Sequence, residues 1–235
     1  MLRKILRILG AVILVIVIVF GILYAIYNEP LPEGRSGPEA DALAEKMLSS
    51  LNYEEYRNTR FIEWSFRNDS HFYKWDREKR KVEVQWDDFR VELDLINTGS
   101  SIGYKNGERL NTHENEDIVE DAIAMFNNDS FWLVAPYKVF DPGTQRQVVI
   151  LEDGSEGLLV TFNRGGTTPG DSYLWLLQPS GFPKSVKMWV KIIPIGGVEA
   201  TWDEWLVTDS GAFLPKSHVM GPMEISMGDV KGYNY

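Results

Sequence analysis

The chain has 235 residues, of which 44% are hydrophobic and 25% charged, and it contains no cysteine. This composition fits one globular domain with an appendage, and it excludes disulfides, thiolate catalysis, cysteine-ligated zinc and a lipid-modified N-terminal cysteine. The formal net charge of −10 repels phosphate backbones, so we expect no nucleic-acid binding.

The N-terminal end of the chain reads as a membrane anchor. An uncharged apolar run, residues 8–27, follows a stub of residues 1–7 that carries Arg3, Lys4 and Arg7. A helix of about twenty residues spans roughly 30 Å, the thickness of a hydrocarbon core. The run is longer than the apolar part of a cleavable signal peptide and ends in bulky residues, which favours a retained transmembrane helix. The basic stub predicts a cytoplasmic N-terminus, with the rest of the chain outside.

Residues 28–37 are rich in proline, glycine and charged side chains, which predicts an extended linker. The remaining residues, 38–235, are expected to form one folded domain. This domain opens with a helix, because apolar side chains from Ala40 to Leu51 recur at spacings of three and four residues.

After this helix the hydrophobic period changes to two, which predicts half-buried antiparallel strands. The first strands place these apolar side chains on one face: Ile62, Trp64, Phe66, Val82, Val84, Trp86, Phe89, Val91, Leu93 and Leu95. The dipeptide Asn106-Gly107 then marks a hairpin turn. A second helix is predicted within residues 115–129, where acidic side chains crowd the first turn and complement the helix dipole.

The rest of the chain is predicted to be a meander of strands at residues 146–151, 158–162, 172–178, 184–192, 198–207, 213–220 and 223–230. Their short links imply antiparallel neighbours, and the total of about eleven strands exceeds what a flat open sheet tolerates. The predicted fold class is therefore mainly β (α+β). We expect one strongly curved antiparallel sheet that forms an unclosed β-barrel of about eleven strands, with helices lying over its concave face.

The hairpin of residues 172–190 carries an unusual load of large apolar side chains. Tyr173 and Trp175 are predicted to share the concave face with the returning strand's Val186, Met188 and Val190. Leu174 and Leu176 of the first strand then face outward. They require a cover, because such a patch is too apolar for an exposed surface.

Three stretches carry a resemblance to a known family. FWLVAPYKVFD (131–141) follows the mid-chain helix, SYLWLLQPSGFPKSVKMWV (172–190) turns through Gly-Phe-Pro, and WDEWLVTDSGAFLPKSHVM (202–220) repeats a strand, a glycine turn and Leu-Pro. With the order of elements over residues 38–231, they resemble the LolA/LolB-like lipoprotein-carrier superfamily, and more closely its membrane-anchored relatives of Bacteroidetes type.

The resemblance implies an unclosed barrel whose hydrophobic cavity takes acyl chains beneath a helical lid. It also implies a bacterial inner-membrane location with a periplasmic domain. The chain departs from the soluble and lipidated carriers because it has a transmembrane anchor and no cysteine. It therefore cannot shuttle between two membranes, and no functional residue is carried over from the family.

The candidate lipid-binding residues are the apolar side chains that the predicted strands turn toward the concave face. They are Ile62, Trp64, Phe66, Val84, Trp86, Val91, Leu93, Tyr173, Trp175, Val186, Met188 and Val190. The same residues would serve equally as core, since tryptophan is usually buried in folded proteins.

Other chemistry finds little support in the sequence. GSSIG (99–103) matches a nucleophile-elbow string but is followed by a hairpin signal rather than a helix. NRGGTTPGD (163–171) lacks the Gly-Lys-Ser/Thr of a phosphate-binding loop. His71, His113 and His218 are not at metal-ligand spacing, and Asp203 and Glu204 would point to opposite faces of a strand. We therefore expect no catalytic residue, metal or cofactor.

Two functions remain open at this stage. The first is non-enzymatic binding of the acyl chains of a lipid or lipoprotein in a half-barrel cavity. The alternative is a structural or carbohydrate-interacting envelope module with a solidly packed barrel, in which Trp75, Trp202 and Trp205 are the candidates for sugar stacking because polar side chains flank them.

Overall fold

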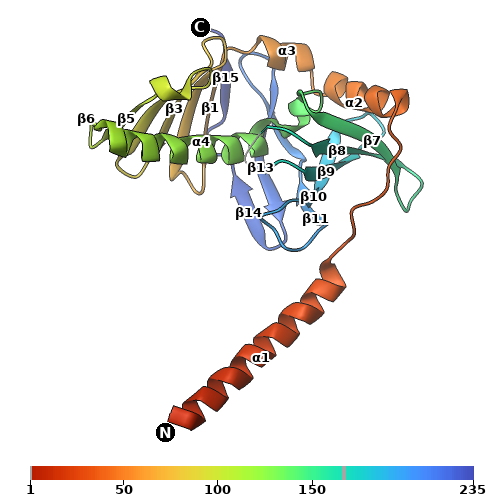
Figure 1. Ribbon diagram of the computed structural model, residues 1–235. Coiled ribbons are helices and arrows are strands. Elements are labelled where there is room, and N and C mark those ends of the chain that lie inside the picture. Colours follow the sequence, from red (N-terminus) through yellow and green to blue (C-terminus); the bar gives the residue numbers. More distant parts are fainter. Residues whose placement is uncertain (1, 166–167) are drawn as a thin grey trace.

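The N-terminal helix α1 (Leu2–Tyr27) extends away from the folded part of the chain in the computed structural model, which describes residues 2–165 and 168–235 (Figure 1). An 18-residue window within Leu6–Tyr27 has a mean hydropathy of 3.1, and none of that window is buried. By length and composition α1 can therefore be a membrane anchor or a signal sequence.

The first of three antiparallel sheets has seven strands. Its strands, in spatial order, are β15 (Lys231–Tyr233), β1 (Phe61–Phe66), β2 (His71–Asp76), β3 (Lys81–Trp86), β4 (Phe89–Asp94), β5 (Ile102–Lys105) and β6 (Glu108–Arg109). The C-terminal strand β15 thus pairs with β1, the first strand of the chain.

The other two sheets have five and three strands. The five-stranded sheet runs β11 (Val198–Thr201), β10 (Pro183–Trp189), β9 (Asp171–Leu177), β8 (Glu156–Phe162) and β7 (Thr144–Ile150). The three-stranded sheet runs β12 (Glu204–Val207), β13 (Phe213–Met220) and β14 (Met223–Ser226). The fold class is α+β, as predicted.

The prediction of one strongly curved sheet is wrong, because none of the three sheets is closed or strongly curled. The chain leaves the ladder between β11 and β12 at Trp202 and Asp203, which belong to no strand, and a bulge beside Pro215 shifts the register between β12 and β13. Proline has no N–H to donate to a ladder, and a bulge bends its strand. Isolated hydrogen bonds bridge the gaps, from Val219 N–H to Thr201 Oγ1 (3.0 Å) and from Ser65 N–H to the Met227 carbonyl (3.1 Å).

The elements differ from the sequence prediction in further places. Strands β2 and β15 are not among the predicted strands, residues 198–207 form two strands rather than one, and the predicted strand 223–230 is the shorter β14. The short helix α3 (Tyr53–Asn58) follows the predicted first helix α2 (Pro38–Ser50). Two 3₁₀ helices, η1 (Thr98–Ser100) and η2 (Ala135–Lys138), complete the described elements.

The mid-chain helix α4 (Thr112–Val134) is longer than predicted and takes in the Phe-Trp-Leu-Val of the resemblance motif. It begins with a side-chain cap, because Asn111 Oδ1 accepts a hydrogen bond from Glu114 N–H (3.2 Å) and Asn111 Nδ2 donates to Glu114 Oε2 (2.6 Å). Figure 1 shows α4 crossing in front of the seven-stranded sheet and reaching the other two sheets with its C-terminal end.

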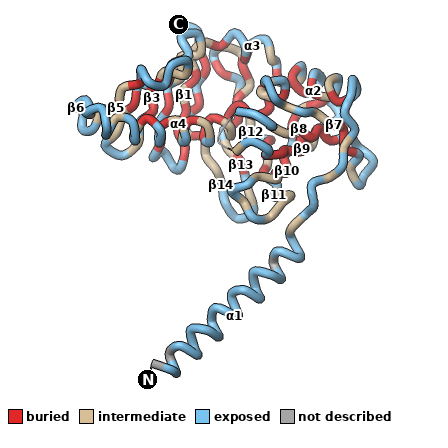
Figure 2. Tube along the Cα trace, in the orientation of Figure 1, coloured by how far each residue is buried: buried red, intermediate tan, exposed pale blue. Residues whose placement is uncertain are grey.

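Most buried residues belong to one hydrophobic cluster, shared by the three sheets, α2 and α4 (Figure 2). The hairpin of β9 and β10 contributes as predicted, since Tyr173 pairs with Met188 and Trp175 pairs with Val186 on the inner face. A second, smaller cluster on the outer face of the five-stranded sheet contains Leu174, with Val149, Leu159, Leu151, Leu176 and Trp189.

The predicted linker supplies the cover that the outer cluster requires. Its Glu29 carbonyl accepts from Trp189 Nε1 on β10 (2.8 Å), and Arg35 exchanges two backbone hydrogen bonds with Val148 of β7 (2.9 Å each). Because the sheet order is β10-β9-β8-β7, a segment fixed to both strands must cross β9 and β8. Arg35 pairs with the free edge of β7 and so lies four strand spacings, or roughly 19 Å, from β10. The six Cα–Cα steps from Glu29 to Arg35 can span this distance.

Candidate functional site

The twelve candidate residues of the concave face lie in one place. Those of β1, β3, β4, β9 and β10, together with Val190 directly after β10, all belong to, or pack against, the main hydrophobic cluster. All of them are buried except Trp86 and Val190, which are half-buried. The inward-facing set was thus found by sequence alternation, and the question is what occupies the space in front of it.

Helix α4 occupies that space with aromatic side chains directed at each of the three sheets. Phe126 packs edge-on against Trp75 of the seven-stranded sheet, with ring centroids 5.3 Å apart. Phe131 meets Tyr173 of the five-stranded sheet at 4.5 Å, and Trp132 stacks on Trp202 beside the three-stranded sheet at 5.9 Å. Access for any guest on the inner face therefore requires displacement of α4.

A buried polar cluster fixes the middle of α4 to the seven-stranded sheet. Asp129, which is 1% exposed, accepts a hydrogen bond from the Tyr73 hydroxyl (2.5 Å) and lies 2.7 Å from His71 Nδ1. Burial, and then the Asp129 carboxylate, raises the pKa of the Tyr73 phenol, which therefore stays protonated and donates. Sequence reasoning could not find this cluster, because Asp129 lies far along the chain from His71 and Tyr73.

A second polar contact fixes the C-terminal end of α4. The imidazole of His218 is fully buried, with Nδ1 2.8 Å from the Thr201 carbonyl and Nε2 2.7 Å from the Trp132 carbonyl. Burial lowers the pKa of His218, although both carbonyls and the Asp203 carboxylate act in the opposite direction. A neutral imidazole carries one N–H, so it can donate to one of these two carbonyls at a time.

Four tryptophan side chains in and beside this region have no partner for their indole N–H. Within residues 2–165 and 168–235, the buried Nε1 atoms of Trp64, Trp75, Trp175 and Trp202 have no hydrogen-bond partner. Leaving a buried donor unpaired costs about 1–3 kcal/mol, and native proteins keep few such groups. Four in one core therefore call for a physical explanation.

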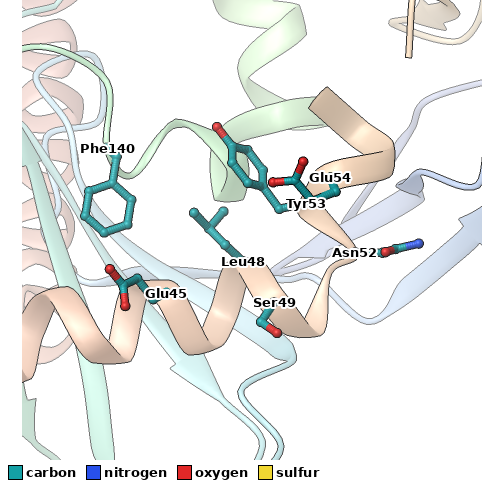
Figure 3. A pocket seen from close by; sticks show the side chains of 7 residues that line it. All are labelled: Glu45, Leu48, Ser49, Asn52, Tyr53, Glu54 and Phe140. Carbon is teal, nitrogen blue, oxygen red and sulfur yellow. The ribbon is translucent and has the colours of Figure 1, made fainter. Parts of the chain in front are cut away.

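The surface carries a cavity of about 600 Å³ between α2 and α3 (Figure 3). Leu48, Tyr53 and Phe140 give it apolar walls, and the carboxylates of Glu45 and Glu54 lie at its rim. One face of Phe140 is covered by the Arg146 guanidinium, 4.3 Å from the ring centroid. This shallow site combines aromatic and acidic groups, which suits a sugar or a cation.

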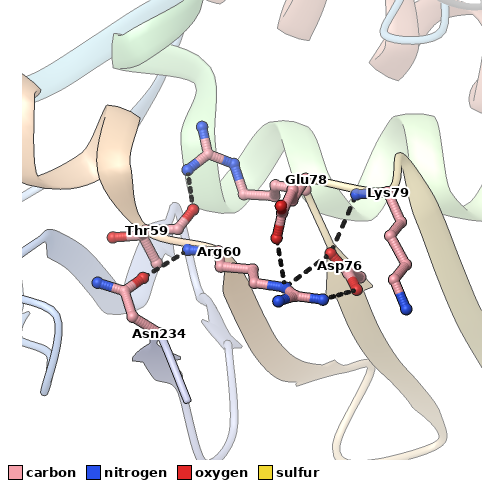
Figure 4. A network of polar contacts seen from close by, with 7 residues as sticks. Thr59, Arg60, Asp76, Glu78, Lys79 and Asn234 are labelled. Carbon is pink, nitrogen blue, oxygen red and sulfur yellow. Dashed lines mark hydrogen bonds and ion pairs between the residues drawn. The ribbon is translucent and has the colours of Figure 1, made fainter.

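A second cavity, of about 580 Å³, lies at the end of the seven-stranded sheet near the C-terminus and is lined by Arg57, Arg60, Arg77 and Arg80 together with Trp75. Part of this positive charge is already paired with carboxylates (Figure 4): Arg60 binds Asp76 Oδ2 (3.1 Å) and Glu78 Oε2 (2.9 Å). Arg77 donates to the Thr59 carbonyl (2.7 Å) and covers the Tyr56 ring.

The remaining sequence candidates do not form sites in the described part of the chain. The GSSIG string has no nucleophile elbow, because Gly99 and Ser100 lie in η1 and a strand follows. No group of three or more metal-ligating side chains occurs among the described residues. Trp202 is 1% exposed and cannot stack on a sugar in this conformation, whereas Trp75 and Trp205 are half-buried.

The chain was compared with protein-family models, with curated proteins and with solved structures, and it matches none of them. By its fold and contacts, the protein is an α+β domain that follows an N-terminal apolar helix, and α4 covers its aromatic interior.

Proposed function

We propose that the protein is a single-pass inner-membrane protein of a bacterial envelope, and that its periplasmic domain binds the acyl chains of a lipid or lipoprotein between α4 and the sheets. In this proposal α4 is a displaceable cover, and the twelve inward-facing residues line the space that opens beneath it. The protein acts without catalysis and in the manner implied by its resemblance to the lipoprotein carriers.

The observation that carries the proposal is the set of four buried indole N–H groups without an acceptor. Acyl chains reach a protein as esters or amides, whose carbonyl oxygens accept hydrogen bonds, so a lipid in this space would supply what Trp64, Trp75 and Trp175 lack. Each buried CH₂ contributes ~0.8 kcal/mol, so a sixteen-carbon chain gains roughly 10 kcal/mol before ordering costs.

The inner face of α4 also suits a cover better than a permanent core element. It places Asp129 and Ser130 at buried positions, alongside Phe126. Buried polar groups that are hydrogen-bonded to one another contribute little net stability compared with apolar packing of the same volume. Displacing α4 therefore costs less than it would for a helix that was apolar along this face.

The second candidate is the packed structural module, and one specific observation favours it. The aromatic side chains of α4 already contact the inner faces of the sheets, with Phe131 4.5 Å from Tyr173. In that case the interior has no guest, and the two surface cavities are the remaining places for a ligand.

A photoactivatable phenylalanine analogue in the full chain separates the two candidates. Phe126 faces the sheets from α4 and is 7% exposed, whereas Phe72 lies on the outer face of β2 and is 48% exposed. The analogue is incorporated at one position or the other in a bacterial host, and the cells are irradiated. The mass of the denatured protein is then measured by mass spectrometry. Acyl binding predicts adducts with the mass of a phospholipid, or with a lipoprotein, at position 126 and not at 72.

Crosslinks from position 126 that remain within the chain, with no lipid adduct, would instead support the packed module. The anchor is tested separately. The protein has no cysteine, so Tyr235→Cys provides a single thiol at an 89% exposed site. We expect this thiol to react with a membrane-impermeant reagent in whole spheroplasts, and the membrane-bound protein to retain α1 by mass. A soluble product beginning near Asn28 would show that α1 is a signal sequence.

A further inference from the structure

The loop of residues 190–197, between β10 and β11, is fixed to the first residues that follow α1. Gly196 N–H donates to Asn28 Oδ1 (2.9 Å), and its carbonyl accepts from Glu29 N–H (3.0 Å). The neighbouring strand strengthens this contact: Trp189 Nε1 donates to the Glu29 carbonyl (2.8 Å), and Lys187 Nζ binds both Glu29 carboxylate oxygens (2.8 Å). The loop therefore cannot move far from the end of α1.

The same loop exposes aliphatic side chains. Ile192 is 71% exposed and Pro194 is also exposed, while Ile193 and Ile195 are half-buried. Leu31, on the segment that leaves α1, is also exposed, at 48%. The apolar surface of α1 is likewise exposed up to Tyr27, so exposed apolar side chains lie on both sides of the contact that Asn28 and Glu29 make with the loop.

The depth of this surface follows from chain geometry. Asn28 is the residue directly after α1, and consecutive Cα atoms are about 3.8 Å apart. The polar region on each side of a hydrocarbon core is roughly 5–8 Å thick. If α1 spans the bilayer up to Tyr27, a loop hydrogen-bonded to Asn28 and Glu29 lies within this polar region.

We infer that the loop of residues 190–197 is a second membrane contact, in which Ile192 and Pro194 enter the boundary between headgroups and acyl chains of the bilayer that α1 spans. The partner is the lipid surface itself. This inference rests on the anchor part of the proposed function and is independent of whether the interior binds acyl chains.

A second contact fixes the orientation of the domain. A single helix followed by a free linker would let the domain turn in all directions, whereas two adjacent contacts hold the outer edge of the five-stranded sheet toward the lipid. The C-terminus and α3, which lie at the opposite end of the domain (Figure 1), then face away from the membrane together with the arginine-lined cavity.

The test uses single cysteines in the full chain, each carrying an environment-sensitive fluorophore. Ile192→Cys has a matched control in Ile96→Cys, because both isoleucines are 71% exposed and Ile96 follows β4 beside the arginine-lined cavity. A third variant, Tyr27→Cys, reports on α1. The proteins are reconstituted into vesicles of phosphatidylcholine and phosphatidylglycerol, with and without brominated acyl chains, which quench fluorophores at the membrane boundary.

We expect brominated lipid to quench the probes at positions 27 and 192 at least threefold more than the probe at 96. Quenching at 27, with the probe at 192 as weakly quenched as that at 96, overturns the second contact and leaves the anchor in place. Quenching at none of the three positions overturns the anchor, and with it the inference.

Discussion

Asp129 brings a carboxylate into an otherwise apolar contact between α4 and the seven-stranded sheet. The cost of removing one member of such a cluster differs from the cost of removing them all. A lone substitution leaves the partners buried without hydrogen bonds, whereas joint replacement by apolar side chains removes the unpaired groups as well. Non-additivity is therefore the measurable property of this cluster.

We predict that Asp129→Leu destabilises the protein by about 3 kcal/mol, because His71 and the Tyr73 hydroxyl lose their acceptor. Combining Asp129→Leu with His71→Leu and Tyr73→Phe should restore a large part of that loss. Denaturant unfolding of the full chain in detergent measures both variants. A triple variant that is less stable than Asp129→Leu alone would contradict this account.

His218 predicts a pH dependence of stability. Burial lowers its pKa in the folded chain below the ordinary 6.5, so below pH 6.5 the unfolded chain binds a proton that the folded chain does not. Stability from this residue is thus present above pH 6.5 and is lost as the pH falls further. We expect His218→Gln to flatten the decline of unfolding free energy between pH 6.5 and 5, and an unchanged decline in this variant would contradict the assignment to His218.

Sequence reasoning predicted which face of a strand a side chain occupies more reliably than it predicted which residues that side chain contacts. Alternation placed Trp175 inward and Leu174 outward, and the two clusters bear this out. It could not place the phenyl ring of Phe126 against Trp75, because that contact depends on how α4 crosses the sheet rather than on any local pattern. It also gave no sign of the contact between His71 and Asp129, which joins distant segments.

At the scale of elements, the turn between β9 and β10 is fitted closely to α2. Gly181 has a positive φ of 93°, and a Cβ built on it would lie 2.9 Å from the Lys46 carbonyl oxygen. Gly107, in the turn between β5 and β6, has a similar φ of 82° but no atom within 4 Å of such a Cβ. Alanine substitutions at these two glycines therefore separate the cost of backbone strain from the cost of a steric clash with α2.

We predict that Gly107→Ala costs about 1 kcal/mol through its backbone conformation alone. Gly181→Ala should cost roughly 1–3 kcal/mol more, since the Lys46 carbonyl is helix backbone and cannot yield without moving α2. Thermal or denaturant unfolding of the two full-length variants gives the comparison. Equal losses would show that the hairpin turn does not depend on α2.

Element boundaries failed where the local pattern was weak. Strand β2 has the sequence His-Phe-Tyr-Lys-Trp-Asp, in which His71 and Tyr73 face inward and Phe72 faces solvent, so hydrophobicity alone gives no clear alternation. Helix α4 continues to Val134 because its apolar end packs on two sheets, although the hydrophobic period does not mark where it stops. Tertiary contacts decided both cases.

For the molecule as a whole, the partition into three sheets was beyond sequence reasoning. Strand pairing such as that of β15 with β1 joins opposite ends of the domain, and its entropic cost is met only when the whole fold is present. The role of residues 28–37 was equally hidden. Their composition is that of a free linker, yet they are bound to both β10 and β7.

This binding predicts where the folded domain begins. A chain of residues 28–235 keeps the cover on Leu174, Leu159 and Trp189, whereas residues 38–235 expose that cluster to water. Contiguous apolar patches of this kind drive association. We therefore expect residues 28–235 to be monodisperse without detergent and residues 38–235 to associate, as measured by size-exclusion chromatography with light scattering.

A substitution can lift the segment without shortening the chain. A Cβ on Gly34 would lie 2.7 Å from the Gln147 Cβ and 3.2 Å from Val149 Cγ2, so Gly34→Val cannot fit against β7. In residues 28–235 this variant should associate as residues 38–235 do. Gly37→Val changes a neighbouring glycine with no atom within 4 Å, although at a positive φ of 138°, and should remain monodisperse. If all four proteins are monodisperse, the outer cluster needs no cover and the domain begins at α2.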